Sequence, residues 1–423
     1  MIETHAPAER AYLVALDRPR ARFEAEDSLD ELGALVEATG AVVAGRVVQQ
    51  RRAPDPKTWI GKGKAEELSR DAARVNADLI VADEELTPTQ QRTLEEVTAK
   101  RVVDRSAVIL DIFARHARTR EGRLQVEVAQ YEYQLPRLRG IWKGLSRLGG
   151  GIGTRGPGES LLETDRRVIE RRLLDLRAKL AEVQRQRERS RQSRMREGLF
   201  LAALVGYTNV GKSTLMNALA GADVLVADQP FATLDPTTRR MSLNGRGAIL
   251  LSDTVGFVNK LPPALVAAFR ATLEELNDAD LLVHVADAGH PNLHERIAVV
   301  RETLGSLGLA DRPSLMVFNK SDTLRAADGV ALREALVAEF PGAVLTSATT
   351  GEGLDRLRAS LADAAARDWK RVRALVPYSE GALLQRVRER GALHNTAYSE
   401  AGIEIEADVP PDLARELTRR RSA

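Results

Sequence analysis

The chain contains no cysteine in its 423 residues, which excludes disulfide bonds, thiolate nucleophiles and zinc sites with cysteine ligands. It also has no run of about 18 apolar residues, so we expect no transmembrane helix. Its first residues lack the basic and then apolar stretches of a secretory signal. Together these absences predict a cytoplasmic protein.

Histidine is scarce as well, and the six histidines show no HExxH spacing. His290 and His294 stand four positions apart, but they span the expected start of a helix. The alternatives are a metal site built on this pair and two surface histidines, and we favour surface histidines.

Charge is unevenly distributed, although the net charge is only +2. Residues 137–197 hold 17 basic and 8 acidic residues, a net charge of +9, so the rest of the chain carries −7. A basic segment on an otherwise acidic protein suggests contact with nucleic acid.

Residues 1–117 alternate between strand-like and helix-like segments, which predicts a small N-terminal α/β domain. Pro88 after Thr87 is typical of the start of a helix. The other expected elements are strands at Tyr12–Leu16, Val42–Val48, Leu79–Asp83 and Arg101–Asp104 and a helix at Leu29–Ala38.

Residues 118–197 carry apolar residues at alternating spacings of three and four, in two stretches of about two heptads each. Between them, residues 149–158 contain six glycines and a proline, which excludes regular structure. We expect an antiparallel helical hairpin with a glycine-rich tip and Pro136 near the end of its first arm. The second arm would run from about Thr164 to Glu197, or roughly 50 Å.

Residues 198–368 read as strands that are each followed by a helix, which predicts a doubly wound α/β domain. Residues 369–423 predict a small α+β tail domain, with strands at 372–376 and 403–406 and helices at 379–390 and after Pro410.

A phosphate-binding loop opens the third domain. Residues 206–213 match GxxxxGK[ST] between a predicted strand and a predicted helix, the context that this motif requires. Backbone N–H groups and the helix N-terminus would face the phosphates, Lys212 would reach the β and γ phosphates, and the Ser213 hydroxyl would bind Mg²⁺. The predicted contacts are Gly206, Tyr207, Thr208, Asn209, Val210, Gly211, Lys212 and Ser213.

A DxxG motif, Asp253-Thr254-Val255-Gly256, follows a strand forty residues later. Asp253 suits the second magnesium contact, and the Gly256 N–H can face the γ phosphate. Thr233, within Phe231-Ala232-Thr233-Leu234-Asp235, is the candidate that closes over Mg²⁺, with Thr237 and Thr238 as alternatives. Lys212, Thr233 and Gly256 are the predicted catalytic residues, and Ser213, Thr233 and Asp253 are the predicted magnesium ligands.

A guanine-reading motif, Asn319-Lys320-Ser321-Asp322, follows a later strand. The Asp322 carboxylate can accept from N1–H and N2–H of guanine, donors that adenine lacks. Asn319 can bond N7, the Lys320 stem can cover the base, and the segment Ser347-Ala348-Thr349 can donate a backbone N–H to O6. GTP is therefore favoured over ATP as the nucleotide, with Mg²⁺ as its cation.

Phe257 occupies the position where many GTPases carry a glutamine that orients the attacking water. A phenyl ring cannot form that hydrogen bond. The sequence therefore predicts slow hydrolysis by the protein alone, with a partner that completes the site.

Residues 149–167 resemble the HflX-type GTPase signature GGGIGTRGPGETQLETDRR, with Ser160-Leu161-Leu162 in place of TQL. Trp59–Lys64 resembles the N-terminal GKGK turn of that family, and Val210, residues 231–235 and Phe257 are also similar to it. The resemblance covers nearly the whole chain.

The resemblance implies a factor that binds the large ribosomal subunit and splits stalled ribosomes, notably under heat or other stress. Separately, we expect the protein to be a monomer. The basic hairpin would then contact rRNA phosphates. Tyr131, Tyr133 and Trp142 either stack on bases or belong to the hairpin core. In some family members the N-terminal domain is associated with ATP binding and RNA remodelling, for which Lys62 and Lys64 are the candidates here.

Two other functions compete with ribosome splitting. The first is a ribosome-assembly factor in which hydrolysis only times release. The second is a GTPase that assists RNA modification, for which the chain lacks the cysteine-bearing tail of some tRNA-modifying GTPases.

Overall fold

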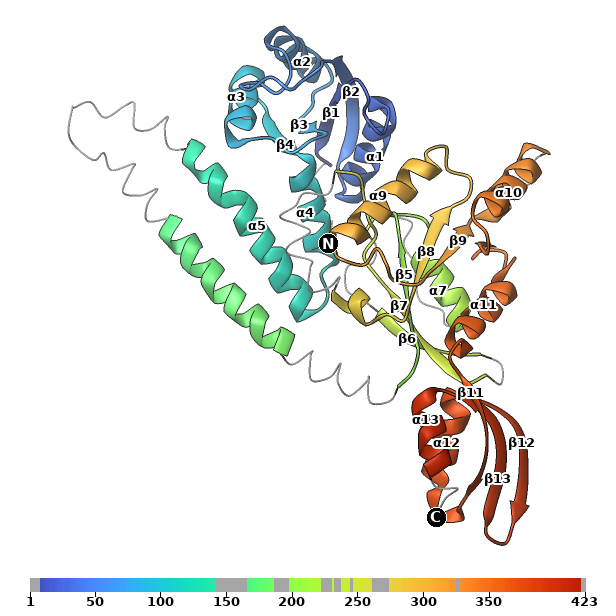
Figure 1. Cartoon of the computed structure of the whole chain (residues 1–423). Helices are drawn as coiled ribbons and strands as arrows, with labels where there is room; N and C mark the ends of the chain where they lie inside the picture. Colours follow the sequence, from blue (N-terminus) through green and yellow to red (C-terminus); the bar gives the residue numbers. More distant parts are fainter. Residues whose placement is uncertain are drawn as a thin grey trace, which may run out of the picture. The chain divides into compact units, whose positions relative to one another are not determined.

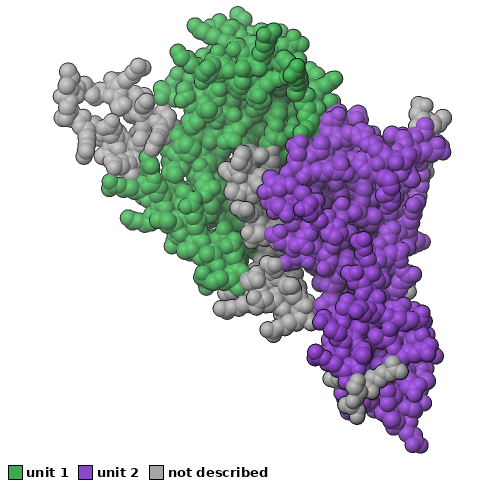
Figure 2. Space-filling model, in the orientation of Figure 1, with its two compact units in different colours: residues 1–185, 228–235, 258–271 green, residues 186–227, 236–257, 272–423 purple. Residues whose placement is uncertain are grey.

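The computed structural model describes residues 8–141, 166–185, 198–221, 230–231, 237–243, 246–260, 274–324 and 327–419, with the side chains of 139–141, 274–275 and 327–328 left out. These residues form two compact units (Figure 2). Unit 1 comprises residues 1–185, 228–235 and 258–271, and unit 2 comprises the rest. Within the described ranges, no helix combines the length and apolarity needed to span a bilayer. The division into four domains remains a prediction.

Unit 1 contains a parallel four-stranded sheet of order β2-β1-β3-β4. Helices α1 and α4 pack together, as do α2 and α3 (Figure 1). A core of mainly aliphatic buried residues lies between the sheet and the helices α2 and α3. Thr87 caps α3 through a capping box with Gln90, as the Thr-Pro start predicts. The elements are β1 (Arg10–Asp17), α1 (Ala25–Ala38), β2 (Val42–Gln50), α2 (Lys62–Arg74), β3 (Leu79–Ala82), α3 (Pro88–Thr98), β4 (Arg101–Asp104) and α4 (Arg105–His116).

The helical hairpin also belongs to unit 1. Its first arm is α5 (Arg120–Ile141), which contains Pro136, and a second helix covers residues 166–185. The two run side by side in opposite directions (Figure 1), and Val128, Leu173 and Leu176 are buried between them. The expected seam is thus present. The glycine-rich tip and residues 186–197 lie outside the described residues.

Unit 2 is built on a six-stranded sheet of order β10-β9-β8-β5-β7-β6, in which only the edge strand β6 is antiparallel. The predicted doubly wound domain is therefore confirmed, with an added edge strand that contains Thr237 and Thr238. The elements are β5 (Leu201–Gly206), α7 (Lys212–Ala220), β6 (Thr237–Ser242), β7 (Ala248–Asp253), η3 (Glu274–Asp278), β8 (Leu281–Asp287), α9 (Leu293–Ser306), β9 (Ser314–Asn319), η4 (Ser321–Leu324), α10 (Ala327–Glu339), β10 (Val344–Leu345) and α11 (Leu354–Ala366).

The tail of unit 2 is an antiparallel sheet of order β11-β13-β12 with two helices packed on one face. Strand β12 was not expected, because it is an edge strand whose ALHNTAYS sequence has no clear alternation and buries little. The elements are β11 (Lys370–Val376), η5 (Tyr378–Glu380), α12 (Gly381–Arg390), β12 (Ala392–Ser399), β13 (Gly402–Val409) and α13 (Pro411–Arg419).

Candidate functional site

The phosphate loop connects the carboxyl end of β5 to the start of α7. Two of its positions admit only glycine. A Cβ on Gly206 would lie 2.2 Å from the carbonyl oxygen of Val285, and one on Gly211, where φ is +85°, would lie 2.5 Å from Asn319 Nδ2. The loop backbone is therefore packed tightly against β8 and the Asn319 side chain, with the α7 N-terminus at its end.

Lys212 is buried at the start of α7. Its Nζ donates to the carbonyl oxygens of Gly206, at 3.2 Å, and Tyr207, at 2.9 Å. Burial lowers the pKa of Lys212 to about 8, and the Asp253 carboxylate partly opposes this shift. Among the described residues this buried ammonium donates to carbonyl oxygens of its own loop. Such a group is suited to bind an anion, since phosphates would offset its desolvation.

The predicted magnesium ligands lie side by side, Ser213 in the first turn of α7 and Asp253 at the end of β7. Ser213 Oγ donates to Asp253 Oδ2 at 2.5 Å. A hydroxyl and a carboxylate oxygen in this arrangement fit Mg²⁺, which keeps most of its remaining ligands as waters and phosphate oxygens. Within the described part of the chain, no cluster of three or more His, Cys, Asp or Glu could hold a metal without such additional ligands.

The DxxG segment lies against the phosphate loop. Thr254 is buried and donates its hydroxyl to Leu204 O at 2.7 Å, so this side chain supports the strand end. A Cβ on Gly256 would lie 2.9 Å from Thr208 Cα and 3.0 Å from Lys212 Nζ, which leaves no room for a side chain. Gly256 therefore places its backbone directly beside Lys212, the predicted phosphate-binding lysine.

Phe257 is buried, with 3% of its surface exposed. Its N–H donates to Gly206 O at 3.0 Å, and its carbonyl accepts from Thr208 N at 2.7 Å. The side chain at this position is thus part of the core, and the backbone ties the DxxG segment to the phosphate loop.

The segment proposed to close over Mg²⁺ is described only at Phe231. Its ring is buried and contacts Phe113 of α4 edge-on, with centroids 4.6 Å apart. Phe231 remains a predicted nucleotide contact, although its ring packs within unit 1. Ala232, Thr233, Leu234 and Asp235 lie outside the described residues. Of the alternatives to Thr233, Thr237 pairs with Asp253 in the β6–β7 ladder, and Thr238 faces Ser252.

The guanine motif is held at the end of β9. Asn319 Nδ2 donates to Val210 O at 2.9 Å, and Asn319 Oδ1 accepts from Ala348 N at 3.1 Å. Asn319 therefore joins the phosphate loop to the Ser347–Thr349 segment, in which Ser347 is fully buried. Asn319 is used here as a structural bridge, which agrees with the expected pinning of neighbouring loops.

Asp322 lies in η4, one residue after the buried Ser321. Its Oδ1 is buried and has no hydrogen-bond partner among the described residues. A buried carboxylate oxygen without a donor is costly, and the N1–H and N2–H of guanine are the donors that would satisfy it. The base-reading residue thus fits the expected ligand.

Asp287 belongs to this site, although no motif pointed to it. Lys320 Nζ donates to Asn209 O at 2.8 Å and pairs with Asp287 Oδ2 at 2.9 Å. Asp287 is the last residue of β8 and lies opposite Asn319 in the ladder with β9. The sequence does contain a signal for Asp287, because an aspartate follows the apolar strand that precedes the strand of the guanine motif.

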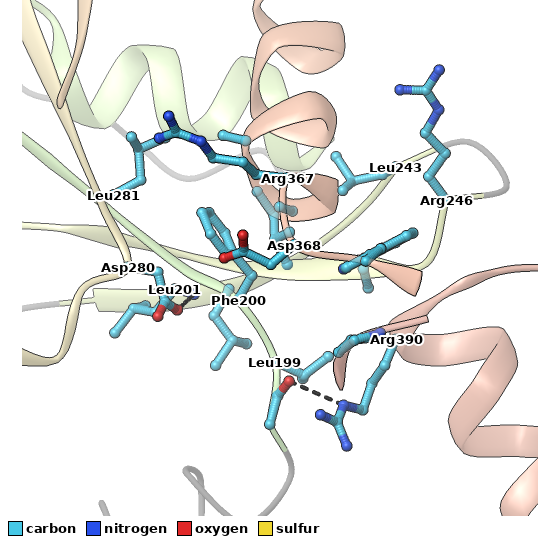
Figure 3. A pocket seen from close by; sticks show the side chains of 18 of the residues that line it. Leu199, Phe200, Leu201, Leu243, Arg246, Asp280, Leu281, Arg367, Asp368 and Arg390 are labelled. Atoms are coloured by element: carbon cyan, nitrogen blue, oxygen red, sulfur yellow. Dashed lines mark hydrogen bonds between the residues drawn. The ribbon is translucent and has the colours of Figure 1, made fainter. Parts of the chain in front are cut away.

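The nucleotide residues lie at the carboxyl ends of the strands, whereas a cavity of about 520 Å³ lies at the amino ends of β5 and β8 (Figure 3). The cavity is lined by Leu199, Phe200, Leu281 and the end of α11. Of the predicted site residues and their alternatives, only Thr238 lines it. Arg390 donates to Gly198 O at 3.0 Å beside this cavity, which joins the tail domain to the GTPase strands.

Three family models match successive parts of the chain. Residues 26–114 match the N-terminal region of GTP-binding GTPases, residues 116–194 match their middle region, and residues 201–320 match the 50S ribosome-binding GTPase domain.

Curated relatives align along the full length. The GTPase HflX of Lacrimispora saccharolytica is 46% identical, over 100% of this chain and 99% of its own. The GTPase HflX of Escherichia coli is 39% identical over the same shares. A crystal structure of a GTP-binding protein from Sulfolobus solfataricus in complex with GDP is 25% identical, covers 85% of this chain and 99% of its own, and has a TM-score of 0.43. With this full-length identity and the site geometry in agreement, the chain belongs to the HflX family of GTPases.

Proposed function

We propose that this GTPase acts in the cytoplasm as a monomer, with Mg²⁺, on the large ribosomal subunit, and that it splits stalled ribosomes under stress. The observation that carries the proposal is the combination, in one chain, of a GTPase site with a hairpin of basic arms. The match of residues 201–320 to a ribosome-binding GTPase model and the HflX relatives support the same partner.

The described part of the hairpin presents only some of its arginines to a partner. Arg172 and Arg177 pair with Glu127 and Glu132 of the first arm. Arg171 and Arg185 are exposed, and no ion pair of theirs is found among the described residues. These two are the arginines that we expect to contact rRNA phosphates.

Two aromatic residues considered for base stacking are used within unit 1. Tyr131 packs against the hairpin seam. Tyr133 donates its hydroxyl to Asp104 Oδ1 at 2.9 Å, and the Arg137 guanidinium covers its ring at 3.5 Å. The hairpin-core alternative therefore holds for Tyr131, whereas Tyr133 packs against the N-terminal sheet. Arg137 does not belong to the RNA-facing charge. Trp142 lies outside the described residues.

Phe257 supports a partner-dependent reaction. The buried phenyl ring leaves the position directly after Gly256 without a side chain that could orient water. We therefore expect slow GTP hydrolysis by the protein alone and faster hydrolysis on large subunits.

The test is GTP turnover by the full chain, with and without isolated large subunits. We expect large subunits to stimulate turnover by the wild type clearly. In R171E/R185E, half-maximal stimulation should require a roughly tenfold higher subunit concentration, because the charge at two expected phosphate contacts is reversed. Basal turnover should be unchanged. R388E, a change at an exposed arginine of α12, is the matched control. No stimulation of the wild type would overturn the ribosome proposal and leave the GTPase assignment intact.

Splitting and assembly are separated by light scattering of whole ribosomes. A fall in scattering with a non-hydrolysable GTP analogue supports splitting. Binding restricted to immature subunits, with no fall in scattering, would contradict it and favour an assembly factor.

A further inference from the structure

Arg333 of α10 connects the two segments of unit 2 that are expected to read guanine. Its Nη2 donates to Ser321 O at 2.6 Å, and its Nη1 donates to Glu352 Oε1 at 2.7 Å. Ser321 directly precedes Asp322 in the guanine motif. Glu352 follows closely after the Ser347–Thr349 segment. One guanidinium, which no motif includes, therefore bridges both sides of the predicted base site.

The bond to Ser321 holds the peptide group that leads into Asp322. Ser321 is fully buried, and its N–H donates to Thr346 O at 3.0 Å while its carbonyl accepts from Arg333. The carbonyl of Ser321 and the N–H of Asp322 belong to one planar peptide unit. Fixing that unit therefore restricts the direction in which the Asp322 side chain leaves the backbone.

The bond to Glu352 holds the segment that is expected to donate to guanine O6. Ser347 N donates to Glu352 O at 2.9 Å, and Thr350 N donates to Ser347 Oγ at 3.1 Å. The loop that begins at Ser347 is thus closed on Glu352, whose carboxylate accepts from Arg333. A shift of Glu352 would therefore move this loop relative to the guanine motif.

Helix α10 is itself seated closely on η4. A Cβ on Gly329 would lie 2.1 Å from Leu324 O, so the first turn of the helix contacts the η4 backbone directly. Leu336 is buried in the same cluster as Leu324. Gly329, Arg333 and Leu336 follow one another at spacings of four and three residues and share one helix face. Arg333 therefore extends from a helix that is fixed on either side of it.

We propose that Arg333 is a positioning residue that sets the specificity for guanine, because it holds Asp322 and the Ser347–Thr349 segment at a fixed separation. Asp322 would accept from N1–H and N2–H of the base, and the segment would donate to O6. These contacts reach one base together only if the two segments keep their spacing. With the spacing set beforehand, nucleotide binding requires less ordering of the site. The proposal rests on the assignment of both segments to guanine and is independent of ribosome binding.

The test compares the affinities of the full chain for GDP and inosine diphosphate by calorimetry. Inosine lacks the 2-amino group of guanine, so Asp322 can accept only from its N1–H. We expect R333M to weaken GDP binding about tenfold and inosine diphosphate binding about threefold, because two parallel bonds depend more on alignment than one does. The preference for GDP should thus fall about threefold. R333K keeps the charge but not the planar fork, and it should retain part of the preference.

R358M is the matched control. Arg358 of α11 donates to Ala218 O at 3.0 Å and pairs with Asp355 at 3.0 Å, so it makes the same two kinds of contact near the end of α7. Its side chain is 29% exposed, and that of Arg333 is 26% exposed. R358M removes a comparable structural contact and should leave the preference for GDP unchanged.

E352A removes the other half of the bridge. It should lower the preference for GDP by a smaller factor than R333M does, because Arg333 keeps its bond to Ser321. An unchanged preference in R333M or in E352A would overturn the proposal. An equal loss of preference in R358M would also overturn it, because the effect would then be unspecific.

D322N distinguishes a failure of this proposal from a failure of the guanine assignment. If D322N binds GDP as tightly as the wild type, the assignment is wrong and the role of Arg333 falls with it. If D322N binds GDP weakly and R333M retains the wild-type preference, only the role of Arg333 is refuted.

Discussion

At the residue scale, the site depends on a few buried polar groups that lack protein partners suited to their charge. Asp322 Oδ1 is buried without a donor among the described residues. Within the same part of the chain, Lys212 Nζ donates to two carbonyl oxygens of its own loop. Both groups are costly in the absence of a ligand, and a guanine nucleotide would satisfy both. The predicted specificity for guanine nucleotides therefore rests on buried polar groups that lack suitable partners among the described residues.

We predict that D322N weakens GTP binding roughly 100- to 1,000-fold, because the amide loses one acceptor for the guanine donors and opposes them with its own N–H groups. The same variant should gain affinity for xanthosine triphosphate, whose C2 carbonyl accepts from that amide. Both affinities can be measured by calorimetry, with the exposed D311N as control. Unchanged GTP affinity in D322N would refute the assignment of Asp322.

A second residue-scale prediction concerns pH. Burial, reinforced by Arg301 and Lys212, lowers the pKa of His284 in β8 to about 4. In the unfolded chain, the pKa of His284 is near 6.5. Below pH 6.5 the unfolded state therefore binds this proton more readily than the folded state does. The stability contributed by neutral His284 is present above pH 6.5 and is lost as the pH falls toward 4, about 2 kcal/mol of it between pH 7.5 and 5.

H284Q should remove this part of the acid destabilisation. In urea unfolding of the full chain, the difference in stability between pH 7.5 and 5 should be smaller in H284Q than in the wild type by about 2 kcal/mol. H394Q, at an exposed position, is the control. An identical pH dependence in H284Q and the wild type would contradict the assigned pKa.

At the scale of elements, the hairpin is fixed to the N-terminal sheet by a buried ion pair. Arg137 of α5 donates to Asp104 Oδ2 at 2.9 Å and to Leu86 O at 2.8 Å. Asp104 is fully buried, accepts from Tyr133 and caps α4 through Ala107 N. Burial and the adjacent Asp104 carboxylate raise the pKa of Tyr133. The tyrosine therefore stays protonated and acts as a donor.

We predict that R137A weakens this attachment by about 3 kcal/mol, because it leaves Asp104 buried without its cation. Hydrogen exchange of the α5 amides should accelerate in R137A. The matched control is R172A, which removes an exposed pair on the same hairpin and should cost less than about 1 kcal/mol. Equal protection of α5 in R137A and R172A would show that the buried pair is not the attachment.

At the scale of the whole molecule, unit 2 combines the GTPase domain and the tail. Arg390, 6% exposed, donates to Gly198 O and to Asp412, at 3.0 and 2.7 Å. A Cβ on Gly247, where φ is +77°, would lie 2.8 Å from Glu389 O, so the β6–β7 turn packs closely on α12. These contacts make the tail part of unit 2.

R390A should loosen the tail at a cost of about 2 kcal/mol, since the half-buried carbonyl of Gly198 loses a charged donor. Limited trypsin digestion should then release the tail faster than from the wild type. R386A removes the exposed pair with Glu416 and serves as control. The same cleavage rate in R390A and R386A would show that the joint does not depend on Arg390.

Much of the molecule follows from local sequence. The phosphate loop can be placed without a structure, because its motif is recognised by a strand before it and a helix after it. Its glycines at 206 and 211 stand where the close packing of the loop leaves no room for a Cβ. The hairpin seam follows from apolar spacing alone, because two apolar stripes must cover each other. The sequence likewise predicts the order of strands and helices, since their periodicities are local properties.

Tertiary structure alone decided what depends on long-range contacts. Strand β12 has little periodicity and exists because β13 pairs with it. In the sequence, Arg137 counts as part of the basic surface charge and Tyr133 as a candidate for base stacking. In the structure both bind the buried Asp104, about thirty residues earlier in the chain. Lys260 carries no motif, yet it pairs with the buried Asp83 carboxylate 177 residues earlier in the chain. The sequence by itself determined the chemistry of the site, because that chemistry lies in contiguous motifs, whereas the supports of the site required the fold that brings distant charges together.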